Sequence, residues 1–471
     1  MVLSTLADSV TRGVESMSDS VSEALFEPVI RLGVTGLARS GKTVFITSLV
    51  ANLLDRGRMS GLTAQAEGRI AAAYLQPQPD DTVPRFDYET HLAALTSRTP
   101  SWPDSTRAVS ELRLSLKVRP AGLLSGLQGP RTVHLDIVDY PGEWLLDLGL
   151  LNKSFNEWSD GTLSWLNSRA SAQGVMERLR AVDPTAKHDE ALAQDLAKCF
   201  ARYLTVARSE GYYRCTPGRF LLPGELEGSP VLTFAPIPWA EPSKRGSLHR
   251  EMERRFEAYK SKVVKPFFRD HFSRIDRQVV LVDALDAIHT GPQAVEDLRL
   301  AMADTLTAFR PGSNGFLSQL LRGKRVEKVL FAATKADHLH HTQHPRLSAI
   351  MQALTRDAAD RARFAGAGTQ SLALASVRAT TEATLSHEGK PLDCVRGQLL
   401  DTGKQAAFYP GDLPEDPNHL LTPAREGSDK WLDGDYQVMR FAPAHLTLKP
   451  GEGPPHIRMD KAAEFLIGDK L

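Results

Sequence analysis

IRLGVTGLARSGKT, residues 30–43, is the stretch that decides the fold of this 471-residue chain. Its first seven residues read as a short buried strand, and VFITSLVANLL, which follows, has the apolar spacing of a helix. Between the two lies the pattern G-x-x-x-x-G-K-[ST] in the strand–loop–helix setting that wraps phosphate groups. The stretch therefore predicts a nucleotide-binding α/β protein.

Each residue type in this loop has a chemical reason. Gly36 and Gly41 let the backbone curl, so that successive N–H groups face phosphates at a helix N-terminus. Lys42 supplies a positive charge to the β- and γ-phosphates, and the Thr43 hydroxyl is a ligand for Mg²⁺, the expected cofactor. The loop residues expected to contact the nucleotide are Gly36, Ala38, Arg39, Ser40, Gly41, Lys42, Thr43 and Val44.

A second motif ends the strand-like run RTVHLDIVDYPGE, residues 131–143. Asp139 at the strand end can hold Mg²⁺ through water, and the Gly142 N–H can meet a γ-phosphate. The pattern D-x-P-G at residues 139–142, directly after a strand, resembles the switch II signature of translation-factor-type GTPases.

Two later motifs concern the base. KVLFAATKADHL (328–339) carries TKAD, which resembles the [NT]-K-x-D motif: a carboxylate at Asp337 can accept hydrogen bonds from guanine N1–H and the 2-amino group, and Lys335 would cover the base. LALASVRAT (372–380) resembles the S-A-K motif, in which a backbone N–H, here that of Val377, meets guanine O6. Because ligands bind at the carboxyl ends of strands in open α/β sheets, this order of motifs predicts GTP or GDP rather than ATP. The expected base contacts are Thr334, Lys335, Asp337, Ser376, Val377 and Arg378.

The order of these motifs, with WPDSTRAVSELRLSLKVR before the DYPG strand, is similar to the YcjX-like family of bacterial stress-associated P-loop GTPases. The resemblance covers nearly the whole chain, and its specific fragments are GLARSGKT, DYPGEW and TKADH. It implies a Ras-like core of the TRAFAC type that carries large insertions. It implies no settled cellular role.

The predicted fold class is α/β. Alternation in ELRLSL (111–116) and TVHLDIVD (132–139) predicts a hairpin beside a mostly parallel sheet with one antiparallel strand, covered by helices on both faces. More than 120 residues with helical periodicity then precede the next core strand, RQVVLVDALDA. The predicted units are an N-terminal amphipathic helix (1–29), a first part of the GTPase core with a long switch I (30–150), a helical insertion (151–276), a second part of the core (277–380), a Pro- and Gly-rich insertion with strand-like QAAFYP and YQVMRFAP (381–455) and a C-terminal core helix (456–471).

The residues expected to act in hydrolysis are Lys42, Thr106, Arg39 and Glu143. Thr106 precedes the hairpin strand, where the switch I threonine that coordinates Mg²⁺ should lie, and Thr90, Thr99 and Ser105 are its rivals. The metal ligands expected are Thr43, Asp139 and Thr106.

Glu143 and Arg39 each allow two interpretations. Glu143 stands where many small GTPases place a water-orienting Gln, yet a carboxylate there is repelled by the γ-phosphate. It is therefore either catalytic or an acid favoured by a helix N-terminus. Arg39 could supply charge to the β–γ bridge from within the chain, or form an ion pair that points away from the phosphates.

Composition limits the remaining possibilities. Lys plus Arg number 57 and Asp plus Glu also 57, so a broad nucleic-acid or polybasic membrane surface is not expected. Three scattered cysteines indicate buried thiols in a reducing compartment, and no apolar run approaches the ~20 residues of a membrane span. The apolar stripe from Leu3 to Leu25 leaves a packed helix, a partner or dimer contact and membrane docking open. We expect a cytoplasmic protein, with the inner-membrane surface as the alternative location.

The function predicted is a GTP-hydrolysing switch with slow turnover, whose helical insertion moves with switch II in a bacterial stress response. A nucleotide-gated scaffold with negligible turnover and an ATP-dependent kinase are the alternatives. The expected partners are GTP or GDP and an unidentified protein effector, a membrane-associated stress protein among the candidates; the oligomeric state stays open. His338, His340, His341 and His344 crowd past TKAD, where a polar loop explains them better than a metal site, which needs converging ligands and an outer shell.

Overall fold

The computed structural model describes residues 27–37, 39–104, 108–121, 129–239, 244–305, 326–428, 432 and 436–471. The apolar stripe predicted between Leu3 and Leu25 lies outside these residues, as do Ala38, Ser105 and Thr106. The roles predicted for them stay predictions. Within the described ranges, no helix is both long and apolar enough to cross a membrane.

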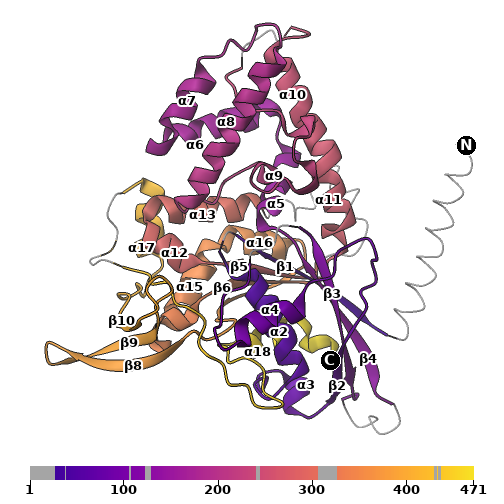
Figure 1. Cartoon of the computed structure of the whole chain (residues 1–471), viewed down its shortest axis with the longest axis vertical. Helices are drawn as coiled ribbons and strands as arrows, with labels where there is room; N and C mark the ends of the chain where they lie inside the picture. Colours follow the sequence, from indigo (N-terminus) through magenta and orange to yellow (C-terminus); the bar gives the residue numbers. More distant parts are fainter. Residues whose placement is uncertain are drawn as a thin grey trace, which may run out of the picture.

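A seven-stranded sheet runs through the molecule in the order β2-β3-β4-β1-β5-β6-β7 (Figure 1). β3 is antiparallel to both of its neighbours, and the other pairings are parallel. The fold class predicted from the sequence is thereby confirmed. The strands are β1 (Val29–Gly36), β2 (Ile70–Gln76), β3 (Ser110–Val118), β4 (Arg131–Asp139), β5 (Arg277–Val282), β6 (Lys328–Ala333) and β7 (Gly368–Ala373).

The register brings the carboxyl ends of the parallel strands to one edge. Val34 of β1 lies opposite Asp139 of β4, and Gly36 lies opposite Leu281 of β5. Ala333, the last residue of β6, lies opposite the last residues of β5 and β7. The three motif-bearing turns that follow β1, β4 and β6 therefore open on the same side of the sheet.

Alternate residues of the sheet face two separate cores, as expected for strands covered on both faces. In β5, Leu281 packs into one core and Val280 into the other, and both are buried. Helices α2 (Lys42–Leu54), α3 (Thr63–Ala66), α4 (Tyr88–Thr96) and α18 (Met459–Ile467) cover the first face, and α12 (Ala284–Thr290), α13 (Pro292–Thr305), α15 (His344–Leu354) and α16 (Arg356–Phe364) cover the second.

Between β4 and β5, all the regular elements of the described chain are helices. They lie above one end of the sheet (Figure 1). Their centre is aromatic: Trp158 stacks on Phe256 with ring centroids 5.1 Å apart, and both are buried. The elements are α5 (Gly142–Leu146), η1 (Asp147–Asn152), α6 (Phe155–Asn167), η2 (Ala170–Ala172), α7 (Gln173–Arg180), α8 (Glu190–Ser209), α9 (Gly218–Leu221), η3 (Gly224–Leu226), η4 (Pro230–Leu232), α10 (Leu248–Tyr259), η5 (Lys260–Val264), α11 (Lys265–Asp270) and η6 (Phe272–Arg274). We call the elements from α6 to η6 the helical layer.

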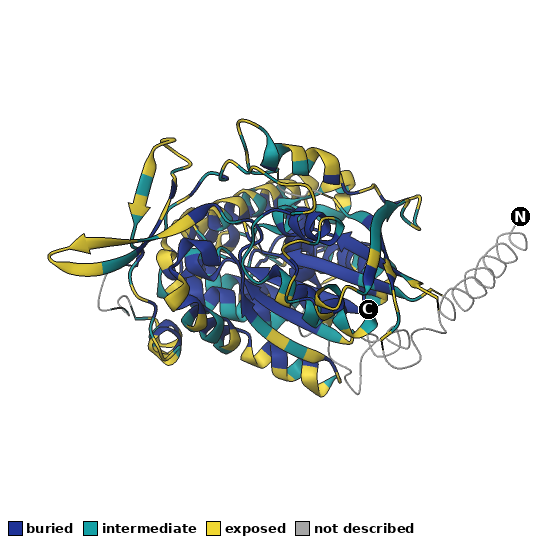
Figure 2. Ribbon diagram, turned by 90° about the horizontal axis from the view of Figure 1, so that it is seen from below, coloured by how far each residue is buried: buried dark blue, intermediate teal, exposed yellow. Residues whose placement is uncertain are grey.

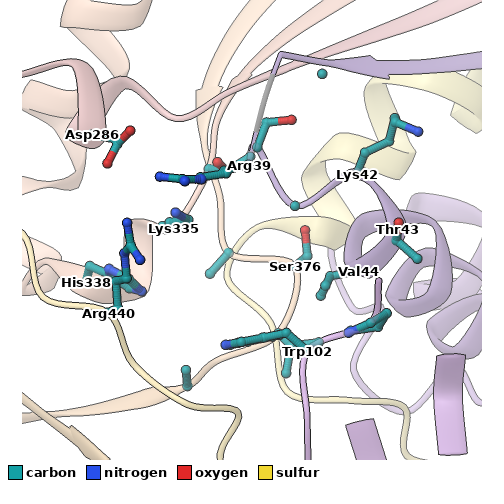
Figure 3. A pocket seen from close by; sticks show the side chains of 18 of the residues that line it. Arg39, Lys42, Thr43, Val44, Trp102, Asp286, Lys335, His338, Ser376 and Arg440 are labelled. Carbon is teal, nitrogen blue, oxygen red and sulfur yellow. The ribbon is translucent and has the colours of Figure 1, made fainter. Parts of the chain in front are cut away.

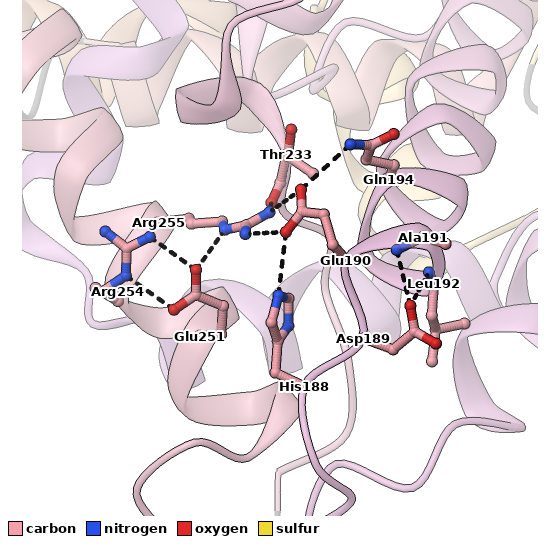
Figure 4. Close-up of polar contacts among 10 residues, drawn as sticks. All are labelled: His188, Asp189, Glu190, Ala191, Leu192, Gln194, Thr233, Glu251, Arg254 and Arg255. Carbon is pink, nitrogen blue, oxygen red and sulfur yellow. Dashed lines mark hydrogen bonds and ion pairs between the residues drawn. The ribbon is translucent and has the colours of Figure 1, made fainter.

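Charged side chains join α8 to α10 within this layer (Figure 4). Arg255 Nη2 lies 2.5 Å from Glu190 Oε2, and Arg255 Nε lies 2.8 Å from Glu251 Oε1. The hydrogen bonds from Arg255 outweigh partial burial and lower the pKa of Glu190 to about 2. Asp189 caps α8 by accepting a hydrogen bond from the Ala191 amide at 2.8 Å. Ionised groups thus tie α8 and α10 together.

The chain after β7 adds a second, three-stranded sheet in the order β10-β9-β8, made of β8 (Thr380–His387), β9 (Lys390–Gln398) and β10 (Gln405–Phe408), followed by α17 (Asn418–Glu426). The β8–β9 hairpin extends from the body and is largely exposed (Figure 2). The run QAAFYP contains β10, as expected. The strand expected in YQVMRFAP is wrong, since that run forms only one bridge, Leu399 to Phe441, and instead lies along the cavity described below.

Two smaller expectations can also be compared with the structure. All three cysteines are free thiols, and Cys215 and Cys394 are buried, whereas Cys199 is half-buried. HLAALT falls in α4 as expected, but the strand β2 in the long switch I region was not predicted. Its sequence IAAAYLQ lacks the alternation by which half-buried strands are recognised.

Candidate functional site

A cavity of about 420 Å³ opens at the carboxyl edge of the sheet, within the range of small-molecule sites (Figure 3). The turns after β1, β4, β6 and β7 all contribute to its walls. From the predicted set it gathers Gly36, Arg39, Ser40, Gly41, Lys42, Thr43, Val44, Gly142, Glu143, Thr334, Lys335, Asp337, Ser376 and Val377.

The turn between β1 and α2 forms one end of the cavity. Gly41 has a φ of 77°, in the left-handed region that glycine adopts without strain, and α2 begins at the next residue. Ser40 carries a buried hydroxyl for which the described residues supply no hydrogen-bond partner. A curled backbone, a helix start and an orphaned hydroxyl suit an anionic ligand.

Lys42 and Asp139 meet at this end. The Lys42 ammonium is ion-paired with Asp139; the Asp139 side chain is buried, and that of Lys42 is 10% exposed. Burial lowers the pKa of Lys42, and the Asp139 carboxylate opposes that shift. The Thr43 hydroxyl, one residue on, donates to the Asp104 carbonyl at 3.3 Å. A hydroxyl and a carboxylate beside a buried ammonium are the donor set that fits Mg²⁺ with a phosphate chain.

Gly142 is the point where the DYPG motif touches the phosphate loop. A Cβ at this position would lie 2.0 Å from the Gly36 carbonyl oxygen, so only glycine allows the approach. The Gly142 backbone is therefore held against the residue where the loop begins.

The opposite end of the cavity holds the base motifs. Asp337 is buried, and its Oδ2 accepts a hydrogen bond from the Ala379 amide at 2.8 Å. Lys335 adopts a φ of 59° and pairs with Asp283 at the end of β5. Ser376 is joined to α2, because the Ser48 hydroxyl donates to its carbonyl at 2.5 Å. The turns after β5, β6 and β7 thus meet at this end of the cavity.

Arg378 is the one described residue of the predicted set, apart from Asp139, that is not part of the cavity wall. Its amide donates to the Pro455 carbonyl at 2.8 Å. Thr90 and Thr99, the described rivals of Thr106, do not line the cavity either. The Thr90 amide donates a hydrogen bond to the side chain of Asp87, which caps α4. The described part of the switch I region reaches the cavity through Trp102, Pro103 and Asp104 instead.

Arg39 extends along the cavity toward Asp286 (Figure 3). Burial raises the pKa of Asp286, and the positive charges of Lys335 and Arg39 oppose that shift. The side chain of Arg39 is exposed and its backbone has a φ of 60°. The side chain thus points away from Lys42, and both interpretations of Arg39 stay predictions.

Glu143 is buried at the wall of the cavity, where Arg208 from the end of α8 reaches it, with Arg208 Nη2 2.5 Å from Glu143 Oε1. Reasoning from sequence missed Arg208 altogether. It is one of two arginines on the amphipathic helix α8, and no local motif distinguishes it. Its approach to Glu143 depends on how the helical layer packs.

The sequence analysis also missed the segment from Val438 to Phe441, which closes the base end. The indole Nε1 of Trp102 donates to the Phe441 carbonyl at 2.8 Å, and the Phe441 ring meets His338 edge-on at 5.1 Å. Aromatic and apolar residues in YQVMRF were the available signal, but they were interpreted as a strand.

Comparison with known proteins gives a family for this arrangement. Residues 30–471 match the YcjX-like family, also described as DUF463. The chain is 39% identical over 459 residues to a protein of Escherichia coli (strain K12) named Ras-like GTPase YcjX, an alignment that covers 94% of this chain and 96% of that protein. It is 35% identical over 484 residues to a protein of the same name from Shewanella oneidensis (strain MR-1), covering 97% and 98%.

Proposed function

The chain belongs to the YcjX-like family, and from that premise we propose that it is a slow, Mg²⁺-dependent GTPase whose nucleotide state is transmitted to the helical layer. GTPase-type function follows from the relatives; the residue roles, the rate and the coupling are our proposals. The observation that supports them is the convergence of Lys42, Gly142 and Asp337 on one cavity at the edge of the sheet.

The phosphate end would bind and neutralise the triphosphate. Lys42 would leave its contact with Asp139 for the β- and γ-phosphates, while Thr43 and Asp139 would hold Mg²⁺, which neutralises charge on the phosphate oxygens. The Gly142 amide would donate to the γ-phosphate. This last contact exists only with GTP, so it distinguishes GTP from GDP.

The base end would select guanine. One oxygen of the Asp337 carboxylate is occupied by the Ala379 amide, which fixes the orientation of the side chain. The other oxygen and the remaining lone pairs would accept the guanine N1–H and 2-amino hydrogens. Adenine presents no such pair of donors, so burying this carboxylate against adenine would leave it unsatisfied.

Coupling to the helical layer would run through the residues directly after Gly142. Glu143 pairs with Arg208 of α8, and the Arg219 guanidinium of α9 lies 3.3 Å from the centroid of the Trp144 ring. A displacement of Gly142 by the γ-phosphate would therefore disturb contacts in α8 and α9. From the composition and the spacing of the motifs we also propose a cytoplasmic location and a GTPase core interrupted by insertions. On the family resemblance alone we propose a role in stress with a protein effector.

One observation favours a second function, a nucleotide-gated scaffold that hardly turns over. The Glu143 carboxylate stands one residue after Gly142 and is held by Arg208, so it is not arranged as an amide that orients water. A carboxylate so close to the γ-phosphate repels both it and an attacking hydroxide. The GTPase would therefore be slow, and the scaffold would show no measurable multiple turnover.

Multiple-turnover phosphate release from the purified chain separates the two functions. We expect release from GTP at a rate on the order of 10⁻⁴ to 10⁻² s⁻¹, none from ATP, and none from Lys42→Ala with either nucleotide. GTP binding without phosphate release would support the scaffold function instead. Equal hydrolysis of ATP, or activity that survives Lys42→Ala, would refute the proposed GTPase.

A further inference from the structure

The four histidines that follow the TKAD motif divide into two pairs. His338 and His344 are buried, and burial lowers the pKa of both. His344 Nε2 lies 2.7 Å from the Ala336 carbonyl, and His338 packs against Phe441. This first pair is part of the protein interior.

The second pair, His340 and His341, turns toward the β8–β9 hairpin. Their ring centroids are 4.3 Å apart. His341 Nδ1 lies 2.9 Å from Glu382 Oε2, and His340 Nε2 lies 3.7 Å from the same oxygen. Three possible ligand atoms from two separate segments therefore converge within 4.8 Å of one another.

His340 also has outer partners. Its Nδ1 lies 2.9 Å from the Thr342 hydroxyl and 3.5 Å from Asp393 Oδ2 on β9. A metal-bound imidazole usually has its second nitrogen held by a carboxylate or another polar group, which fixes the ring and raises its basicity. Here the Nδ1 side is held in this way, while Nε2 faces Glu382 and His341.

We propose that His340 Nε2, His341 Nδ1 and the Glu382 carboxylate form a zinc site, with Thr342 and Asp393 as outer partners and water completing the coordination. Two imidazoles and one carboxylate suit Zn²⁺ better than Mg²⁺, which prefers oxygen ligands. The side chain of His340 is only 10% exposed and that of His341 is 64% exposed, so an ion can enter from solvent and meet a fixed inner ligand. The sequence could not show whether ligands converge or have outer partners. In the structure, His340, His341 and Glu382 converge, and Thr342 and Asp393 hold His340 from outside.

The position of this site gives it a consequence for the cavity. Glu382 lies on β8, and the base motif is bound at the start of this strand. The amide of Ala379, just before β8, donates to Asp337 Oδ2 at 2.8 Å, and the hydroxyl of Thr380, its first residue, donates to the Asp337 carbonyl. His340 lies three residues after Asp337. Zinc would therefore join the two segments that hold Asp337, on either side of it, and this consequence rests on the proposed function, in which Asp337 recognises guanine.

The test is a zinc titration of the full-length chain, stripped of metal, in competition with a chromophoric chelator. We expect one equivalent of Zn²⁺ to bind and Mg²⁺ not to compete. Asp393→Asn keeps all three ligands, and we expect it to weaken zinc binding by roughly 10- to 100-fold because it removes an outer partner. His341→Ala, at the exposed ligand, should weaken binding more than that while the chain keeps its thermal midpoint in the absence of zinc.

Matched controls separate a built site from adventitious binding by surface histidines. His387→Ala, farther along β8, and His419→Ala in α17 remove exposed histidines outside the cluster and should leave zinc affinity unchanged. Zinc affinity that is unaffected by both Asp393→Asn and His341→Ala, or no zinc binding at all, would overturn the proposal.

A second measurement keeps this proposal distinct from the GTPase proposal. Guanine nucleotide affinity is measured with and without zinc, and we expect it to rise with zinc in the wild type but not in His341→Ala. Zinc binding without any guanine nucleotide binding would refute the GTPase and leave the metal site standing. Guanine nucleotide binding without zinc binding would refute the metal site and leave the GTPase proposal standing.

Discussion

Arg208 Nη2 lies 2.5 Å from Glu143 Oε1, and this ion pair connects the last turn of α8 to the residue that follows Gly142. The Glu143 side chain is 9% exposed and that of Arg208 30%. The contact is reinforced next to it, because a Cβ on Gly218 would lie only 2.1 Å from the Glu143 carbonyl oxygen. The helical layer therefore reaches the wall of the nucleotide cavity through both a charge pair and a close backbone contact.

Removing Arg208 should lower the preference for GTP over GDP. In Arg208→Ala the Glu143 carboxylate loses its ion pair beside the site of the γ-phosphate, so it repels GTP more than GDP. Affinities for GDP and a non-hydrolysable GTP analogue give the ratio. Adding Glu143→Gln to Arg208→Ala should restore it, whereas Arg202→Ala, at an exposed position on the same helix, should not change it. A ratio unchanged in Arg208→Ala would argue against the pair as a sensor.

Asp337→Asn should change base specificity. An amide at this position presents a donor where guanine needs an acceptor, and it suits the carbonyl that xanthine carries in place of the 2-amino group. We expect weaker GTP binding and a gain for xanthosine triphosphate, measured by competition with a fluorescent nucleotide. Retained GTP preference in this variant would contradict the role assigned to Asp337.

Asp147 predicts a pH dependence of stability. It follows α5, is buried, and accepts hydrogen bonds from the Tyr259 hydroxyl at 2.5 Å and the Gly218 amide at 2.7 Å. Burial raises the pKa of Asp147 to about 6, against the lowering effect of those hydrogen bonds. The folded state therefore binds a proton that the unfolded state releases between about pH 4 and 6, and the contribution of this group to stability falls as pH rises through that window.

The measurement is the difference in the free energy of unfolding between pH 5 and pH 7. Asp147→Asn has no titrating group at this position, so relative to wild type it should lose a pH-dependent component of about 1.3 kcal/mol between these two pH values. Parallel pH profiles for the two proteins would show that Asp147 does not titrate in this range.

Gly218 and Gly161 form a matched pair of glycine substitutions. Gly218→Ala forces a methyl group against the Glu143 carbonyl and should cost about 1–3 kcal/mol, while also separating α9 from α5. Gly161 lies inside α6 with no atom near its hypothetical Cβ, so Gly161→Ala should stabilise the chain by about 0.5–1 kcal/mol. Chemical denaturation of both variants checks the opposite signs; a neutral Gly218→Ala would mean that the two helices separate easily.

Local patterns were sufficient for the core of the fold. Strand–loop–helix at residues 30–54 and the alternation of ELRLSL depend on a few neighbouring residues, so periodicity located β1, α2 and β3. The motif residues could be placed together because parallel strands end at one edge. That rule holds whatever connects the strands.

Long-range packing was beyond the sequence. Arg208 meets Glu143 across 65 residues of helical chain, and Phe441 accepts a hydrogen bond from Trp102 across more than 300. The local sequence around either residue gives no indication of its distant partner. The same reason hid the partnership of His340 with Glu382, since the sequence shows the histidines but not the hairpin strand that faces them.

Hydrogen–deuterium exchange under GDP and under a non-hydrolysable GTP analogue tests whether the γ-phosphate is sensed beyond the cavity. We predict that exchange differs between the two states both in residues 142–152 and in residues 204–222, and that Lys42→Ala abolishes both differences. A difference confined to the phosphate loop and the base motifs, with identical exchange in residues 204–222, would contradict the proposed coupling of nucleotide state to the helical layer.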